Sequence, residues 1–417
     1  MKRKSIAILA ALVVIAAAVA TAAAFAQPKA GSLKIYVLAG DRIPMEAVLK
    51  VWKQQNPSVK VNVTYADTSP YQSTLRTQLA AGTAADVFEV WPGNGNPGAI
   101  QVLAPYGYLA DLTKQPFAKR EPAGIKQVTH VKGKLYFVPP AYSGIGAIYN
   151  METLAKLGVS APTTWSDVLA LCDKAKAAGL AAYSLGNQDQ WVTQLIPYAL
   201  VPTLVYRTQP NFEANLKAGK TSFSKSGWVT AENKYVEMNE RGCFQQGPLS
   251  TNYNASLPLV ANGHAAVGVV QGSWAFAPLR QANPTATYRM FPFPATNNPT
   301  QTWMPGAANA GFAVNAKTKN PLAMKFVNFV ASSAFQNTFA KTQGSLPAYP
   351  NPSFKVDAGL TRFVAFQKAG KTYPFPDQLW PNPKVQQAHL VGLQDIFAGK
   401  GSVADMLAAM DKAYHSK

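Results

Sequence analysis

The chain has 417 residues, of which 48% are hydrophobic and 14% are charged. Its 39 Lys and Arg residues against 20 Asp and Glu residues give a formal net charge of +19. The length allows two or three domains with substantial cores, and the low charged fraction excludes a disordered polybasic protein. Two cysteines exclude a disulfide-dense scaffold, and four histidines argue against a zinc site with several ligands.

The N-terminus has the pattern of a cleavable export signal over residues 1–26. Residues 2–4 are basic, residues 6–20 form an uncharged apolar run, and Ala24 and Ala26 place small side chains at the cleavage positions. A single-pass anchor is the alternative, but the run is short for a membrane span. Cleavage after Ala26 would leave 391 residues with a net charge of +16 and no cysteine at hand for a lipid anchor. We therefore expect a protein free in the periplasm.

Apolar periodicity then predicts strands and helices in alternation. The helix after the first strand has apolar side chains at Met45, Val48, Leu49 and Trp52, and Gly82 ends the next helix. Strands alternating with helices of this length indicate parallel or mixed sheets covered on both faces. Because no repeat or low-complexity linker divides the chain, we expect an α/β fold of two lobes. The predicted elements are strand 33–38, helix 45–55, strand 59–65, helix 71–81, strand 86–90, strands 135–138 and 145–149, and helix 321–340.

The two cysteines are the only thiols of the chain. Cys172 lies on the apolar face of a predicted helix, and Cys243 follows another helix. In an oxidising compartment we favour a disulfide, with two buried free thiols as the alternative. A loop of 71 residues would gain about 4 kcal/mol of stability in the chain-entropy model.

Several short motifs, each a weak signal by itself, follow one another in order along nearly the whole chain. They make the chain resemble family 1 of the extracellular solute-binding proteins, which feed carbohydrate ABC transporters. One departure is Ala85, where that family usually has proline. The motifs include Leu79-Ala-Ala-Gly-Thr-Ala-Ala-Asp-Val-Phe, Gly133-Lys-Leu-Tyr-Phe-Val-Pro, Ile148-Tyr-Asn-Met-Glu-Thr-Leu, Gln271-Gly-Ser-Trp-Ala and Gly344-Ser-Leu-Pro-Ala.

This resemblance implies two lobes that close on a ligand, of the type II-like periplasmic binding protein fold. A ligand that contacts both lobes favours the closed state, which would then dock on membrane permease subunits. We expect three hinge crossings, near residues 140–143, 268–272 and 313–316. The expected N-terminal lobe comprises residues 27–140 and 272–313, and the C-terminal lobe comprises residues 141–271 and 314–417.

Candidate ligand-binding residues lie in loops at the predicted strand ends, where ligands sit in open α/β sheets. A sugar has an apolar ring face and a rim of hydroxyls, so its recognition needs aromatic side chains beside amides, carboxylates or guanidinium groups. The alternatives are core packing for the tryptophans and simple solvation for the polar residues. The candidates are Asp41, Arg42, Glu89, Trp91, Tyr142, Gln190, Trp191, Trp274, Asn309 and Trp380.

We therefore expect a monomeric, periplasmic binding component for sugar or polyol uptake, with no catalytic residues, metal or cofactor. A sugar acid or phosphorylated polyol is the alternative ligand, because the positive charge favours anions and Arg42 offers a partner.

Two other classes of protein fit the sequence less well. A secreted glycoside hydrolase needs two facing carboxylates, for which Asp41 and Glu89 are the available pair, but the sequence lacks nucleophile-elbow, zinc-protease and phosphate-loop motifs. The basic residues are scattered and not gathered in a stripe, which argues against nucleic-acid binding.

Overall fold

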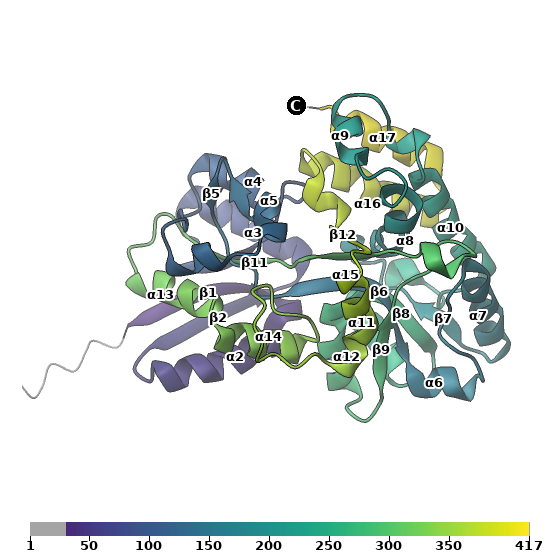
Figure 1. The fold of residues 1–417 in the computed structure, drawn as a ribbon, viewed down its shortest axis with the longest axis horizontal. Coiled ribbons are helices and arrows are strands. Elements are labelled where there is room, and N and C mark those ends of the chain that lie inside the picture. The colour runs from purple at the N-terminus through teal and green to yellow at the C-terminus, as the bar shows by residue number, and fades with distance from the viewer. Residues whose placement is uncertain (1–30, 417) are drawn as a thin grey trace, which may run out of the picture.

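The computed structural model describes residues 31–416 and shows two α/β lobes side by side, each built on its own sheet (Figure 1). The expected signal segment 1–26 and its cleavage site lie outside the described residues. No helix within residues 31–416 is long and apolar enough to cross a membrane.

The first lobe contains a four-stranded mixed sheet in the order β11-β3-β1-β2. Strand β1 pairs in parallel with β2 and β3, and β11 runs antiparallel to β3. A small hairpin, β4–β5, lies outside this sheet. The strands are β1 (Ser32–Leu38), β2 (Lys60–Ala66), β3 (Val87–Val90), β4 (His130–Val131), β5 (Lys134–Leu135) and β11 (Gly311–Val314).

Helices cover both faces of the first sheet. Alternation along β1 sends Leu33, Ile35 and Val37 into one core with α2, α13 and α14, while Tyr36 packs with α3 and α4 on the other face. Gly82 ends α3 with a φ of 73°, a conformation that glycine adopts without strain. The helices are α2 (Arg42–Gln55), α3 (Thr68–Ala81), α4 (Ile100–Leu103), α5 (Lys126–Thr129), α13 (Pro321–Val330) and α14 (Ser333–Gln343).

The second lobe contains a six-stranded sheet in the order β12-β10-β6-β8-β7, with β9 also paired to β6. Strand β6 is long and almost wholly buried, and it pairs antiparallel with β8, β9 and β10. The strands are β6 (Tyr142–Asn150), β7 (Ala181–Ser184), β8 (Ala266–Gly272), β9 (Tyr288–Phe291), β10 (Met304–Ala308) and β12 (Thr372–Tyr373).

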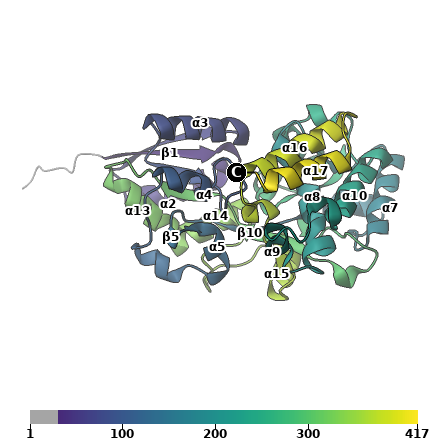
Figure 2. The same cartoon turned by 90° about the horizontal axis from the view of Figure 1, so that it is seen from above.

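Helix α8 lies on this sheet, and α10 packs over α8, while α16 and α17 pack against each other at the C-terminus (Figures 1 and 2). A large aromatic core joins these helices to the strands. The helices are α6 (Met151–Lys156), α7 (Trp165–Ala177), α8 (Leu195–Val201), α9 (Phe212–Lys217), α10 (Trp228–Arg241), α11 (Tyr253–Ala261), α12 (Phe276–Ala282), α15 (Thr361–Lys368), α16 (Pro383–Phe397) and α17 (Val403–Tyr414).

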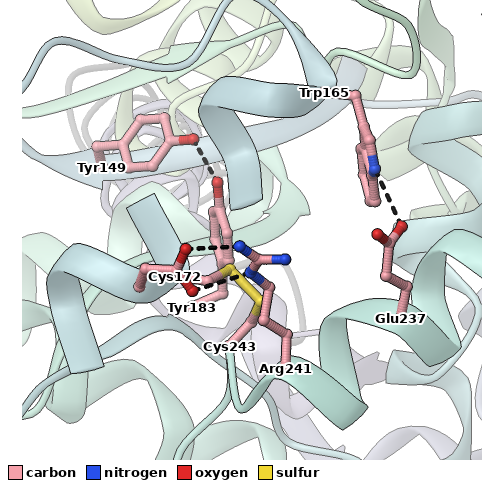
Figure 3. The surroundings of a disulfide bond; sticks show 8 residues. Tyr149, Trp165, Cys172, Tyr183, Glu237, Arg241 and Cys243 are labelled. Atoms are coloured by element: carbon pink, nitrogen blue, oxygen red, sulfur yellow. Dashed lines mark hydrogen bonds and ion pairs between the residues drawn. A yellow bond between two sulfur atoms is a disulfide. The ribbon is translucent and has the colours of Figure 1, made fainter. Parts of the chain in front are cut away.

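The two cysteines form a disulfide that ties α7 to the end of α10 (Figure 3). The Cα atoms of Cys172 and Cys243 are 4.7 Å apart. Close by, Arg241 pairs with Asp173 at 2.6 Å on the surface of the same two helices. The favoured prediction of a disulfide is therefore confirmed, and the alternative of two free thiols is wrong.

Two predicted elements differ in the structure. The single helix expected over residues 321–340 is two helices, because the Ser332 side chain accepts a hydrogen bond from the Phe335 backbone N–H and begins α14 anew. The strand expected over 135–138 is only the end of β5 followed by one isolated bridge at Val138.

The expected lobe boundaries also need correction. Strands β9 and β10 pair with β6, so most of 272–308 belongs to the second lobe. Helices α13 and α14 pack on α2 and β11 and belong to the first lobe. Within residues 31–416 the chain crosses before β6, between β10 and β11, and between α14 and the turn Ala358–Leu360. The first crossing coincides with the expected segment 140–143, but 268–272 and 313–316 lie inside lobes.

Candidate ligand-binding cleft

A cavity of about 450 Å³ lies between the two lobes. The first lobe lines it with residues that follow β1 and β3 and with the first turns of α3. The second lobe lines it with the segments before α8 and after β8, the start of α11, the segment after β12 and the start of α16. The crossing at 308–310 also contributes. The cavity therefore lies where the carboxyl ends of β1, β3 and β8 meet, as expected for a site in an open α/β sheet.

Three half-buried tryptophans line the cavity, one from the first lobe and two from the second. Trp91 contacts the Tyr71 ring edge-on at 5.8 Å, and Trp191 lies 6.5 Å from Trp274 between ring centroids. Gly272 provides the room for Trp274, because a Cβ at that position would lie 2.1 Å from the indole ring. These rings are held from behind and are open to the cavity, so both lobes offer an aromatic surface to a ligand.

A chain of polar side chains joins the lobes where the crossings meet. Gln343, at the end of α14, donates a hydrogen bond from Nε2 to Asp41 Oδ1 at 2.5 Å. Its Oε1 accepts hydrogen bonds from Asn309 Nδ2 at 3.2 Å and from Ser345 Oγ at 2.7 Å. Ser345 in turn lies within hydrogen-bonding distance of Ser143 and Ser273. Side chains at all three crossings are thus joined in one hydrogen-bond network beside the cavity.

Two carboxyl groups lie at the first-lobe end of this network. Burial raises the pKa of Asp41 to about 6, although the hydrogen bond from Gln343 acts in the opposite direction. Burial, and then the charge of Asp41, raise the pKa of Glu89 well above its usual range. Burial therefore disfavours the charged form of both carboxyl groups, and the rise in pKa is larger for Glu89 than for Asp41.

A second polar group lies on the opposite side, where α16 begins. Gln386 donates a hydrogen bond to Gln194 Oε1 at 3.2 Å and lies 3.4 Å from Asp377 Oδ2. Burial raises the pKa of Asp377 to about 6. Asp189 accepts the backbone N–H of Tyr253 at 2.8 Å, which fixes the start of α11 at the cavity wall.

The lobes also touch through backbone beside the cavity. Gly93 and Gly95, in the loop after β3, face the carbonyl oxygens of Gln378 and Asp377. A Cβ at these two glycines would lie 2.0 and 1.9 Å from those oxygens. Asn94 adds a hydrogen bond to the Pro381 carbonyl. Only glycine permits this approach, so the contact depends on the sequence Gly93-Asn-Gly95.

Comparison with known proteins decides the family. The family profile described as bacterial extracellular solute-binding protein matches residues 38–337. The chain belongs to the bacterial extracellular solute-binding protein family. It is 23% identical over 342 residues to the multiple sugar-binding protein of Streptococcus mutans, an alignment that covers 81% of this chain and 79% of that protein.

Solved structures of this fold cover nearly the whole chain. A chitin oligosaccharide binding protein superposes with a TM-score of 0.78 at 19% identity and covers 92% of this chain and 98% of its own. The solute-binding protein RafE in complex with raffinose superposes with a TM-score of 0.74 at 18% identity, again covering 92% and 98%. The two-lobed binding-protein fold that the sequence predicted is confirmed.

As a solute-binding protein, the chain brings six of the ten predicted site residues to the cavity. They are Asp41, Trp91, Gln190, Trp191, Trp274 and Asn309. The sequence feature that predicted them is an aromatic or polar residue just after a strand, flanked by glycine, proline or asparagine. That pattern identifies positions at the open edge of the sheets.

The other four predicted residues do not line the cavity. Arg42 is exposed, and its guanidinium lies over the Tyr65 ring at 4.1 Å. Glu89 is fully buried beneath Asp41 and accepts the Leu38 N–H at 2.6 Å. Tyr142 donates a hydrogen bond to the Gly306 carbonyl and stacks on a phenylalanine of α15. Trp380 is only 1% exposed, because it packs in the aromatic core of the second lobe.

The sequence interpretation missed several residues that line the cavity. Gln343 precedes the motif Gly344-Ser-Leu-Pro-Ala, which would have been the signal for it. Asp377 and Gln378 lie shortly before Trp380, in a proline-bounded turn. Helix α16 gave no signal, because Gln386 sits on an ordinary amphipathic helix. The missed lining residues include Arg76, Asn96, Tyr253, Gln343, Asp377, Gln378 and Gln386.

The same geometry weakens the hydrolase alternative. The Asp41 and Glu89 carboxyl groups belong to the same lobe, and Glu89 is fully buried and does not line the cavity, so the pair does not face each other across it. His389 is not available as a catalytic group either, because its Nε2 lies 2.8 Å from Glu232 Oε1 in a fully buried pair.

Proposed function

We propose that this chain is the solute-binding component of an ABC importer and captures a sugar or polyol between its two lobes. The observation that carries the proposal is a cavity lined from both lobes by tryptophans and by a polar network. A ligand that contacts both walls gains affinity only when the lobes hold it together, so binding would favour the closed arrangement. The sugar-binding names of relatives and the raffinose in a structural neighbour support the choice of ligand class.

The proposal includes a place and a partner for this binding event. The name of the family and the expected signal over residues 1–26 support a secreted, periplasmic protein. The partners would be the permease subunits of the transporter in the inner membrane, with the binding protein acting as a monomer. Its role would be capture and delivery without catalysis.

A thermal-shift panel on the secreted protein tests the proposal. The probes are raffinose, stachyose, xylo-oligosaccharides, chitin oligosaccharides, tagatose and sorbitol, with spermidine and a tripeptide as non-saccharide controls. A ligand at 100 times its Kd should add about 2.7 kcal/mol of stability and raise the Tm visibly. A shift with spermidine or the tripeptide, and with no saccharide or polyol, would contradict the proposal.

A further inference from the structure

A second hollow, of about 310 Å³, lies between the lobes beside the ligand-binding cavity. Seen from above in Figure 2, α4 and α5 of the first lobe lie opposite α9 and the C-terminal end of α17, and residues of all four helices or their ends line the hollow. The turn Pro376–Leu379 separates it from the cavity, and Gln378 of this turn lines both spaces. The hollow is therefore a separate space that only the two lobes together can form.

Two glutamines line the hollow from the first lobe. The side chain of Gln101, in α4, is half-buried and that of Gln127, in α5, is exposed, and neither side chain has a hydrogen-bond partner within residues 31–416. The Gly93 carbonyl accepts the Gln101 N–H at 3.1 Å, and the Gly93 N–H donates to the Val128 carbonyl at 2.9 Å. Gly93 also meets the Gln378 backbone of the other lobe. The loop that makes the contact between the lobes thus positions both free amides.

A lysine and a histidine line the hollow from the second lobe. Lys217 ends α9, His415 follows α17, and both side chains are exposed. Asp411, one turn before His415, accepts the Phe223 N–H at 2.6 Å and so fixes α17 beside the segment that follows α9. In the part of the chain that the structure describes, Lys217 forms no ion pair. Its ammonium group is therefore free to pair with a ligand.

The two neighbouring spaces differ in charge. The ligand-binding cavity has one guanidinium group, from Arg76, and four carboxyl side chains, from Asp41, Asp67, Asp189 and Asp377. Among the described residues, no carboxyl side chain lines the second hollow. The N–H groups of lysine, histidine and glutamine donate hydrogen bonds to an oxyanion, and those from a charged donor are the strongest. The net charge of +19 also attracts anions at long range, so the second hollow suits an anion better than the cavity does.

We propose that the second hollow binds a small anion with carboxylate or phosphate groups, and that this anion strengthens solute binding in the neighbouring cavity. The strengthening rests on the proposed function, whereas the anion site does not. An anion between Lys217 and His415 on one side and the two glutamine amides on the other contacts both lobes, so it favours the arrangement that holds them together. A solute in the cavity favours the same arrangement. Each ligand should therefore raise the affinity of the other by the same factor.

Titration calorimetry with succinate and inorganic phosphate tests the site, with sodium chloride at equal ionic strength as the control. Each anion is titrated into the protein alone and into the protein saturated with the saccharide that raises its Tm most. We expect saturable binding of at least one anion, and a saccharide Kd that falls at least about 5-fold when the anion is saturating.

The outcomes of this titration separate the two proposals. Saccharide binding without saturable anion binding in either state overturns the inference and leaves the proposed function standing. Anion binding without any response to a saccharide or polyol supports the anion site but contradicts the proposed function. Saturable anion binding that leaves the saccharide Kd unchanged overturns the coupling between the two spaces.

Two lysine variants separate a specific site from general charge. Lys217 and Lys220 are both exposed, but only Lys217 lines the hollow. In Lys217→Gln we expect the anion Kd to rise at least about 10-fold and the gain in saccharide affinity to disappear, because a charged hydrogen-bond donor is lost. The matched control Lys220→Gln should keep both. Equal anion affinity in the two variants would show general screening and overturn the site.

A variant in the other lobe tests whether the anion contacts both lobes. In Gln127→Ala we expect the anion Kd to rise at least about 3-fold and the saccharide Kd to respond less to the anion. Wild-type anion affinity in Gln127→Ala would restrict the site to the second lobe and overturn the coupling. Melting curves verify that all three variants fold.

Discussion

Two groups of tryptophans in the second lobe show how one residue type serves two purposes. Trp228 and Trp380 are buried within a set of rings that includes Tyr198 and Phe223, with centroids about 6 Å apart. Trp191 and Trp274 pack against Tyr253 and Phe375 on one side only and are open to the cavity on the other. Helices α10, α16 and α17 cover the rings of the first group but not those of the second. We therefore expect stability to depend on the first group and ligand affinity to depend on the second.

The largest expected effect is the loss of stability in Trp380→Ala. Removing a fully buried indole leaves a cavity and should cost about 3–5 kcal/mol of unfolding free energy. Urea denaturation measures this loss, and the Kd of the folded fraction should stay within a few-fold of the wild-type value. If Trp380→Ala were as stable as the wild type but failed to bind, the ring would belong to the cleft, and the two groups of tryptophans would not differ in their roles.

Trp274→Ala should show the reverse pattern. Its ring is half-buried, so the cost in stability should be about 1–2 kcal/mol, below that of Trp380→Ala. The loss of an aromatic surface against a ligand should raise the Kd at least about 10-fold. Titration calorimetry on the saccharide that shifts the Tm most gives the Kd, and Trp274→Phe, which keeps an aromatic ring, should recover part of it. Wild-type affinity in Trp274→Ala would contradict the assignment.

Gly95, beside the cleft, touches neither group of tryptophans, so its substitution tests the contact between the lobes by itself. In Gly95→Ala the added Cβ meets the Asp377 carbonyl of the other lobe, so the lobes must separate slightly. We expect stability to change by less than about 1 kcal/mol and the Kd to rise about 10-fold, as closure becomes less favourable.

Gly124→Ala is the matched control, since nothing lies within 4 Å of a Cβ at that position. It should bind as the wild type does. If Gly95→Ala and Gly124→Ala gave the same Kd, the backbone contact between the lobes would have no part in binding.

The smallest expected effect concerns pH. Burial raises the pKa of Glu213, in the second-lobe core, to about 7, and the pKa of Asp41, in the cleft, to about 6. The folded protein therefore binds more protons than the unfolded chain between about pH 4 and 7, and its stability should fall as pH rises through that range.

Glu213→Gln should flatten this pH dependence, because Gln keeps an acceptor for the Tyr206 hydroxyl without the charge. Denaturation at pH 5 and pH 7.5 measures the slope. If the stability of the wild type rose across this pH range, other titratable groups would dominate its pH dependence.

Much of the fold could be predicted from local patterns. Alternation in β1, the glycine that ends α3 and the helical context of both cysteines are all short-range signals. The break between α13 and α14 was missed because Ser332 caps a helix from within an otherwise continuous apolar pattern. The lobe boundaries were missed because β8 and β10 are uniformly buried and give no sign of which sheet they join.

The candidate site was predictable only in part, for a similar reason. Trp91 and Trp380 both lie beside proline and asparagine, yet only the tertiary packing of α10, α16 and α17 buries Trp380. Gln343 lies 302 residues from Asp41 along the chain, so no local pattern could pair them.

We propose that one saccharide is held between the two lobes by aromatic rings from both. The most direct measurement is titration calorimetry of Trp91→Ala and Trp191→Ala, one from each wall, with the saccharide that stabilises the wild type most. We expect each variant to remain folded and to lose at least about 10-fold in affinity. Wild-type affinity in both variants would place the ligand elsewhere and rule out this mode of binding.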